Sequence, residues 1–209
     1  MTEKNINCEI EKKSLRRKIR EALASLDPIA KAFESAGLCM RFIQSETYKS
    51  ARAIFGFMPL KDEVDVLPIL RTALEQEKKV LLPKIRDSAY MDFYFVKEDL
   101  YRETEKSVYG MYEPFSKENP ARLEKIVESC SLDEILVLVP GRAFGRDNSR
   151  LGRGKGYYDT FLRDLSHFYK ENGGHDADKR PFYIGVCYDC QIFDSVPHAA
   201  NDVFMDFLI

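Results

Sequence analysis

The stretch from Glu134 to Leu162 constrains the fold of this chain more than any other. It opens with five apolar residues in a row, Ile135 to Val139, which is typical of a strand buried on both faces. Pro140 and Gly141 end this strand, and a polar loop is expected to follow. From Lys155 onward the pattern predicts a helix. A buried strand that leads through a loop into a helix indicates a βαβ unit.

Between this strand and this helix lies a segment rich in glycine and cations, Arg150-Leu151-Gly152-Arg153-Gly154-Lys155-Gly156. Glycine at every second position lets the backbone approach a ligand closely and adopt a positive φ. The N–H groups freed at the start of a helix bind anions, and three cations lie within six residues. The segment therefore predicts a phosphate site.

Two standard nucleotide motifs do not fit this segment. The P-loop needs Gly where Ser149 stands and Ser or Thr where Gly156 stands, and the dinucleotide motif needs Gly where Tyr157 stands. A basic solvated turn and an RNA-binding Gly-Arg segment remain open on these residues alone. RNA-binding tracts of this kind are usually long and disordered, whereas this segment is short and lies between a strand and a helix. Its position favours a formed pocket.

Composition limits what else the chain can be. Its 209 residues predict one domain, and a hydrophobic content of 44% is ample for a core. A net charge of −2 gives no overall attraction to nucleic acid or anionic lipid. No apolar run reaches the length of a membrane helix, and the charged N-terminus lacks the apolar core of a signal peptide. Five scattered cysteines indicate free thiols in a reducing cytoplasm, with Cys187 and Cys190 packing rather than binding metal.

Hydrophobic patterns along the chain predict strands that alternate with helices. Strands are expected at residues 52–58, 79–83, 91–96, 135–139, 182–187 and 203–208, and helices at 9–26, 28–43, from 62 onward, 121–130 and 155–168. Residues 108–114 are expected to form an irregular loop. The fold class is therefore α/β, a mostly parallel sheet with helices on both faces, in a single domain of residues 1–209. Ligands bind at the carboxyl ends of the strands in such sheets.

Three details of these helices bear on the site. The first helix should bury one apolar side and carry Lys12 and Arg16, four residues apart, on one face. Asp62 should cap the helix after the first strand, and Glu63 should lie in its first turn. The buried side of the first helix is expected to comprise Ile10, Leu15, Ile19, Leu23 and Leu26.

The segment VPGRAFGRDNSRLGRGKGYYDTFL, residues 139–162, resembles the signature of the 5-formyltetrahydrofolate cyclo-ligase family, also called methenyltetrahydrofolate synthetases. Weaker motifs agree in order and spacing along nearly the whole chain: K-x-x-L-R at residues 12–16, Glu63 after the first strand, VLLP at 80–83, G-[IM]-x-E-P at 110–114 and P-x-x-x-x-D at 197–202. The chain departs from the family pattern at Gly145, where Asp is common, at residues 147–149, which replace a Gly, and at Asn201, which replaces a His.

The resemblance implies an ATP- and Mg²⁺-dependent ligase of one-carbon metabolism that closes 5-formyltetrahydrofolate to 5,10-methenyltetrahydrofolate. The γ-phosphoryl group of ATP passes to the formyl oxygen, the other folate nitrogen attacks, and phosphate leaves. A fold similar to that of sugar-phosphate isomerases and CoA transferases is implied. We expect a monomer that binds ATP and a reduced folate, with or without a polyglutamate tail, and that binds neither nucleic acid nor membrane.

The matching positions imply three groups of site residues. The ATP-binding group comprises Lys12, Arg16, Arg150, Gly152, Arg153, Gly154, Lys155, Gly156 and Tyr158. The folate-binding group comprises Met58, Glu63, Tyr109 and Tyr157. The Mg²⁺ ligands are Asp159 and Asp202, whose hard oxygens suit this ion.

Two other functions compete with this interpretation. A sugar-phosphate isomerase or CoA transferase would also use a phosphate loop, but it would leave Lys12, Arg16 and Glu63 without a role. An RNA-binding module using residues 150–155 would show affinity that falls steeply with salt and no dependence on ATP.

Overall fold

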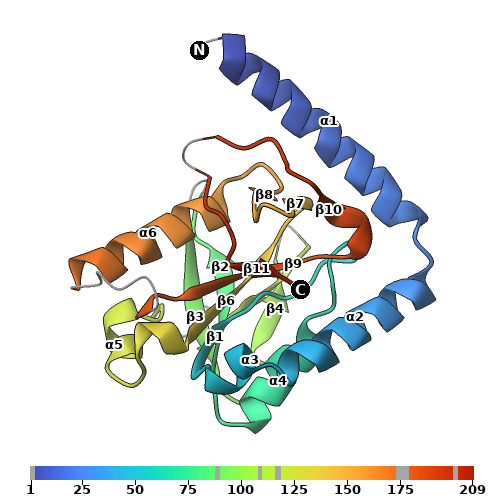
Figure 1. Cartoon of the computed structure of the whole chain (residues 1–209). Coiled ribbons are helices and arrows are strands. Elements are labelled where there is room, and N and C mark those ends of the chain that lie inside the picture. The colour runs from blue at the N-terminus through green and yellow to red at the C-terminus, as the bar shows by residue number, and fades with distance from the viewer. Residues whose placement is uncertain (1–2, 88–89, 108–109, 116–118, 173–178, 200–201) are drawn as a thin grey trace.

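A central sheet organises the computed structural model, which describes residues 3–87, 90–107, 110–115, 119–172, 179–199 and 202–209. Its strand order is β11-β9-β6-β1-β2-β3 (Figure 1). Neighbouring strands run parallel except β2 and β3, which are antiparallel. The predicted mostly parallel sheet is confirmed. The strands are β1 (Ala53–Phe55), β2 (Lys79–Ile85), β3 (Met91–Val96), β6 (Ile135–Pro140), β9 (Phe182–Val186) and β11 (Phe207–Leu208).

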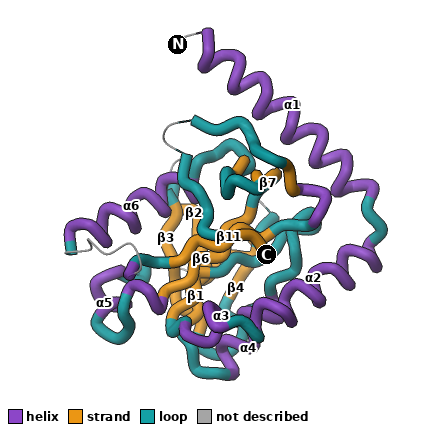
Figure 2. Tube along the Cα trace, in the orientation of Figure 1, coloured by secondary structure: helices purple, strands orange, loops and turns teal. Residues whose placement is uncertain are grey.

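Helices cover both faces of this sheet, as predicted (Figures 1 and 2). Successive residues of β1 show why: Ile54 packs in the core cluster beneath one helix layer, whereas Ala53 and Phe55 pack in the cluster beneath the other. One layer contains α1 (Glu3–Ser25), α2 (Pro28–Ile43), α3 (Glu46–Ser50) and α4 (Leu67–Glu75), and the other contains α5 (Leu123–Val127) and α6 (Tyr157–Glu171).

Helix α1 is buried along only part of its length. Ile19 and Leu23 are buried as predicted, but Ile10 is 62% exposed, so its predicted place in the core is wrong. Figure 1 shows the reason: the N-terminal part of α1 projects beyond the layers that its C-terminal part covers. Periodicity identifies an apolar side of a helix, but it does not show where the partner surface ends.

The helix after β1 begins later than predicted. Asp62 and Glu63 precede it, and α4 starts at Leu67, whose backbone N–H donates to the Asp65 carboxylate at 3.0 Å. Pro68 fixes this start, because proline is tolerated in the first turn of a helix and disrupts its interior. Asp62 therefore caps no helix and is free to form ion pairs.

Short elements account for the other differences from the prediction. The loop after β6 contains β7 (Ala143–Gly145) and β8 (Arg150–Leu151), which form a small sheet with β10 (Ile192–Phe193). Residues 112–114 are not irregular but form β5 (Tyr112–Pro114), antiparallel to β4 (Thr104–Lys106). The regular elements expected at residues 52–58, 121–130 and 203–208 are shorter, with three, five and two residues in β1, α5 and β11, because segments this short give too little periodicity to set a boundary. Single turns of 3₁₀-helix, η1 (Leu132–Glu134) and η3 (Asp189–Gln191), precede β6 and β10.

All five cysteines are free thiols, and Cys187 is buried, which agrees with its predicted packing role. In the described ranges, no helix combines the length and the apolar character needed to cross a bilayer.

Candidate active site

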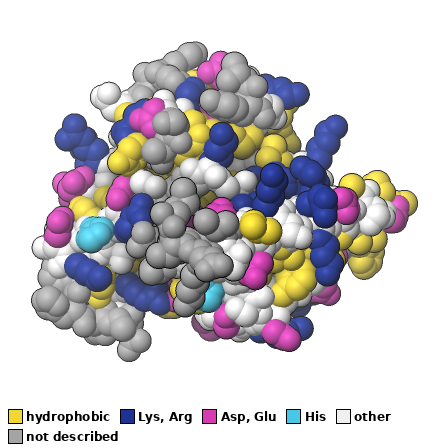
Figure 3. Space-filling model, turned by 90° about the horizontal axis from the view of Figure 1, so that it is seen from above, with side chains coloured by type: hydrophobic (Ala, Val, Ile, Leu, Met, Phe, Trp, Pro, Cys, Tyr) yellow, Lys and Arg dark blue, Asp and Glu magenta, His cyan; other side chains and the backbone are white. Residues whose placement is uncertain are grey.

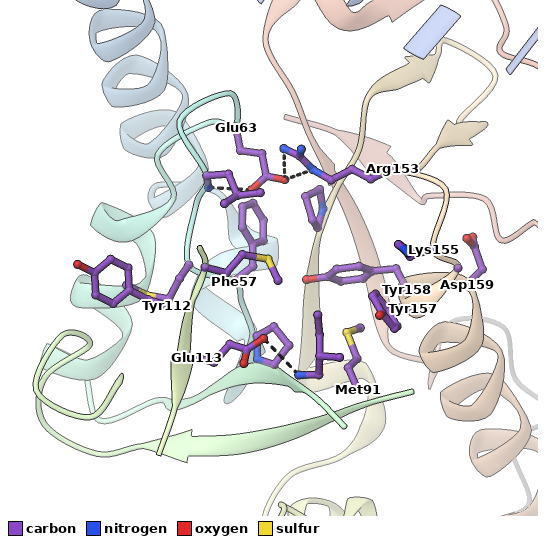
Figure 4. Close-up of a pocket in the computed structure, with 18 of the residues that line it drawn as sticks. Phe57, Glu63, Met91, Tyr112, Glu113, Arg153, Lys155, Tyr157, Tyr158 and Asp159 are labelled. Carbon is purple, nitrogen blue, oxygen red and sulfur yellow. Dashed lines mark hydrogen bonds and ion pairs between the residues drawn. The ribbon is translucent and has the colours of Figure 1, made fainter. Parts of the chain in front are cut away.

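A cavity of about 280 Å³ opens at the carboxyl ends of β1, β2 and β6. Met58 follows β1, Ile85 ends β2 and Pro140 ends β6, and all three line the cavity. The parallel sheet brings these ends to one edge, as predicted. The opposite wall is the segment from Gly152 to Asp159, so the predicted phosphate loop and an apolar chamber share one space (Figure 4).

The phosphate loop has the backbone that its glycines predict. Gly154 has a φ of 100° and Gly156 a φ of 76°, and a residue with a side chain would be strained at either position. Gly156 caps α6 directly, and no side chain occupies the first turn as a cap. The N–H groups at this helix start are therefore available to an anion.

Helix α1 brings two cations to the site from the other end of the chain, Arg16 to this loop and Lys12 to Asp202. The Arg16 guanidinium donates from Nε to the carbonyl oxygen of Gly152 at 2.9 Å. One turn earlier, Lys12 is buried and its Nζ lies 2.7 Å from Oδ2 of Asp202. Seen from above, Lys and Arg side chains gather in the middle and right of the face (Figure 3). Arg16 therefore reaches the phosphate loop itself, whereas Lys12 pairs with Asp202, and the ATP-binding role of both stays a prediction.

Carboxylates neutralise the remaining arginines of the site. Arg150 is buried and reaches Asp159 at 2.5 Å and the carbonyl of Pro140 at 3.2 Å. Arg153 donates from Nε to Oε1 of Glu63 at 2.9 Å and also contacts Asp62. Lys155 is exposed, and it has no ion-pair partner in the part of the chain that the structure describes.

Asp62 ties the loop after β1 to the phosphate loop. Its carboxylate accepts hydrogen bonds from Arg142 and Arg153. Burial alone would raise the pKa of Asp62, but these two bonds and the two positive charges outweigh burial and lower it. Asp62 is a site residue that sequence reasoning assigned to a helix cap, and only the true start of α4 reveals its role.

The apolar part of the cavity contains an unpartnered hydroxyl. The Oη atom of Tyr158 is buried and has no hydrogen-bond partner among the described residues. Burial raises the pKa of Tyr158, so the hydroxyl stays protonated and can donate. The Arg150 guanidinium lies 5.9 Å from the ring centroid of Tyr158. Tyr157 and Met58 line the same cavity, so two residues of the expected folate group lie beside a residue of the expected ATP group.

Glu113 is a cavity residue to which the sequence assigned no role. It lies in β5, is 6% exposed and lines the cavity. Burial raises the pKa of Glu113. The signal was in the sequence, since Glu113 is the acidic residue of the G-[IM]-x-E-P motif at residues 110–114. The motif supported the resemblance, but it did not show which way the side chain points.

Some expected residues remain outside this geometry. Tyr109 and Asn201 lie outside the described residues, so the folate role of Tyr109 stays a prediction.

The other departures from the family pattern form a local unit. Asn148 has a φ of 66°, which Asn tolerates better than most residues. A side chain at Gly145 would clash with Oδ1 of Asp147, and that carboxylate accepts hydrogen bonds from Ser149 and Ser195.

Asp159 and Asp202 are suited to a metal that arrives with a nucleotide. Each forms an ion pair, with Arg150 and Lys12 respectively. In the described ranges, no group of three or more His, Cys, Asp or Glu side chains is placed to hold a metal. Mg²⁺ commonly takes one or two carboxylates and completes its shell with water and phosphate oxygens. The two aspartates fit such a site, and their role as ligands stays a prediction.

Comparison with known proteins decides the family. A model of the 5-formyltetrahydrofolate cyclo-ligase family matches residues 9–209. The chain belongs to this family. The 5-formyltetrahydrofolate cyclo-ligase of Mus musculus is 27% identical over 93% of this chain and 91% of its own length. That of Mycolicibacterium smegmatis is 30% identical over 77% of this chain and 74% of its own. The solved structure of the Aquifex aeolicus 5,10-methenyltetrahydrofolate synthetase matches with a TM-score of 0.71 and 25% identity, over 94% of this chain and 88% of that one.

Proposed function

We propose that this chain is an ATP-dependent 5-formyltetrahydrofolate cyclo-ligase, which closes 5-formyltetrahydrofolate to 5,10-methenyltetrahydrofolate with release of ADP and phosphate. One observation carries the proposal: the segment from Gly152 to Asp159 contains the cationic loop and also forms one wall of the apolar cavity. A nucleotide held by the loop and a heterocycle held by the cavity would meet there. Membership of the cyclo-ligase family supplies the reaction class.

The reaction needs a poor leaving group to become a good one. The formyl oxygen attacks the γ-phosphorus of ATP and ADP leaves, while the lone pair of N5 forms a C=N⁺ bond to the formyl carbon. N10 then attacks that carbon and loses its proton. The C–O bond breaks, the N5 lone pair restores the C=N⁺ bond, and phosphate departs. No protein nucleophile is required, so the chain has to position two substrates and neutralise moving charge.

The cations around the loop can perform this neutralisation. Arg16 and Lys12 approach from α1, and Arg150, Arg153 and Lys155 approach from the loop itself. Lys12, Arg150 and Arg153 pair with carboxylates in the structure. Phosphate oxygens make the same charge-assisted bonds to arginine and lysine, so nucleotide binding would exchange one set of anions for another. Preorganised cations of this kind stabilise a transferring phosphoryl group strongly.

The same exchange would free Asp159 and Asp202. We propose that these carboxylates then hold Mg²⁺, which neutralises phosphate charge when bound. The proposal extends to a monomeric enzyme. It also covers reduced folates with and without a polyglutamate tail.

The decisive experiment follows the near-ultraviolet absorbance of methenyltetrahydrofolate with and without ATP. We expect product from 5-formyltetrahydrofolate only when ATP and Mg²⁺ are present, with one ADP formed per folate. Absence of product, or product formation that ignores ATP, would overturn the proposal. Binding of RNA in an ATP-independent, strongly salt-dependent manner would instead favour a nucleic-acid role for the basic loop.

A further inference from the structure

We propose that Glu113 is the carboxylate that binds the donor edge of the pterin ring, its 2-amino group and N3–H. This inference rests on the proposed function, since it concerns the substrate of the same site. It assigns a specificity role to a residue of the G-[IM]-x-E-P motif, and it separates that role from the one expected for Glu63.

Glu113 has unused hydrogen-bonding capacity in a place where burial is costly. Among the described residues its carboxylate accepts from the backbone N–H of Ile85, whose nitrogen lies 3.4 Å from Oε1, which is long for a hydrogen bond. A carboxylate can accept about four bonds, and a buried carboxylate without partners is destabilising. Glu113 is 6% exposed and its carboxylate borders the cavity. A ligand with two adjacent N–H groups would supply the missing bonds.

The neighbouring charges leave Glu113 available. Burial raises the pKa of Glu113 and the positive charge of Lys84 lowers it in part, but the Lys84 ammonium donates to the carbonyl of Pro114 at 2.8 Å and lies 3.5 Å from Glu105. Glu105 lies directly across the hairpin, in register with Glu113 on β4. The Lys84 ammonium is therefore shared with Glu105 and directed at the Pro114 carbonyl, away from Glu113.

Glu63, by contrast, already has its partners. Its side chain is 7% exposed, and Oε1 lies 2.9 Å from Nε and 2.8 Å from Nη2 of Arg153. The other oxygen, Oε2, accepts from the backbone N–H of Leu60 at 2.9 Å. To bind two N–H groups of a pterin, Glu63 would have to release a guanidinium that it holds at two points.

The position of Glu113 also gives the ring a productive direction. Figure 4 shows Glu113 and Lys155 on opposite sides of the cavity, and Glu63 beside Arg153. In a pterin, the 2-amino group and N3 belong to the pyrimidine ring, whereas N5 belongs to the other ring. If Glu113 holds the pyrimidine edge, N5 and its formyl group point across the cavity toward the phosphate loop. The formyl oxygen would then face the γ-phosphoryl group.

A ligand change matched to a protein change tests this assignment. Binding of 5-formyltetrahydrofolate and of its analogue without the 2-amino group is measured by calorimetry in the absence of ATP. In the unaltered protein we expect the parent to bind about 10- to 150-fold more tightly, the range for a hydrogen bond to a charged group. In Glu113→Gln this preference should fall to less than about threefold. In Glu105→Gln, the control on the same hairpin, it should be unchanged.

Three outcomes would overturn the inference. The first is that Glu113→Gln still prefers the folate with the 2-amino group. The second is that this preference is lost in Glu63→Gln and retained in Glu113→Gln. The third is that the unaltered protein binds both ligands equally. If Glu113→Gln does not fold, Glu113→Asp provides the same test. Asp keeps the negative charge, but its side chain is one methylene group shorter, so the carboxylate lies farther from the ligand. A protein that binds neither folate would instead count against the proposed function, so the two failures are distinguishable.

Discussion

The two ends of the cavity differ in how their polar groups are satisfied. At the phosphate end, Lys12, Arg150 and Arg153 each contact a carboxylate at 2.5 to 2.8 Å. At the apolar end, the Tyr158 hydroxyl has no partner among the described residues and Glu113 has one long contact. At the phosphate end the protein neutralises these three charges, although the buried Arg150 Nε lacks a partner in the described part of the chain, whereas at the apolar end neither polar group has a good hydrogen bond.

This difference implies different energetics for the two substrates. A nucleotide must displace carboxylates from cations, so its binding exchanges bonds and its net gain is small for each contact. A folate would supply bonds that the protein lacks, and each would relieve a buried polar group. Substitutions at the phosphate end should therefore affect phosphoryl transfer most, whereas substitutions at the apolar end should affect folate affinity and stability in opposite directions.

The largest expected effect is the loss of the cations delivered by α1. Replacing Lys12 and Arg16 together with Gln should lower kcat/KM for ATP by about 1,000-fold or more, because removing a single preorganised group already costs about 100- to 1,000-fold. Folate affinity should change little. Steady-state kinetics and folate calorimetry measure the two effects.

The control for this variant lies on the same helix. Lys13 and Arg17 are exposed and point about 100° around the helix from Lys12 and Arg16. Replacing these two with Gln should leave kcat/KM for ATP and the folate affinity unchanged. An equal defect in both double variants would reduce the effect to general positive charge, and near-normal kcat in the first would exclude α1 from the ATP site. Unfolding by urea checks the cost of leaving Asp202 without Lys12.

The second effect concerns the aspartate that Arg150 holds. Asp159→Asn keeps an oxygen for Arg150 and loses the negative charge. We expect the Mg²⁺ concentration for half-maximal activity to rise about tenfold or more, since a metal ligand of this kind needs a hard anionic oxygen. Titration of activity with Mg²⁺ measures it. Asp164→Asn, an exposed position on the same helix, is the matched control, and an unchanged requirement in Asp159→Asn would remove this residue from the metal site.

The third effect tests the apolar end. Tyr158→Phe removes a buried hydroxyl without a partner, so the free energy of unfolding without ligand should stay constant or rise by up to about 1 kcal/mol. Folate affinity should fall by about 2- to 12-fold, the usual range for one neutral hydrogen bond. Thermal unfolding and calorimetry give the two values. A loss of stability without ligand would show that the hydroxyl serves the fold, and full folate affinity would leave it with the ATP-binding role that the family resemblance implies.

The sequence predicted the phosphate end better than the apolar end, for a physical reason. The loop from Gly152 to Gly156 is local, and its glycines, cations and following helix can be seen in one short segment. The contact of Arg16 with Gly152 spans 136 residues, and the family motifs supplied it where periodicity could not. Glu113 and Asp62 acquire their environment only when β5 pairs with β4 and α4 starts at Leu67. These are tertiary events that no local pattern encodes.

The smallest expected effect concerns Asp62, which joins the two arginines Arg142 and Arg153. Its pKa is lowered in the folded protein, because the two arginines outweigh the effect of burial. The unfolded chain, with an Asp pKa of about 3.9, therefore binds a proton more readily than the folded one. The contribution of Asp62 to stability is complete above that value, and it is lost as the pH falls through the lower folded pKa.

Comparing Asp62→Asn with the unaltered protein isolates this contribution. We expect the variant to be less stable by about 1 kcal/mol at pH 7, the scale of a partly exposed ion pair, and the difference should shrink below about pH 4. Urea unfolding at several pH values measures it. Asp194→Asn is the control, because Asp194 is fully exposed and lies 3.9 Å from Arg146. If the difference in unfolding free energy between the two proteins stays constant down to pH 3, Asp62 acts through its shape and not through its charge. The phosphate end would then depend less on ion pairs than its geometry indicates.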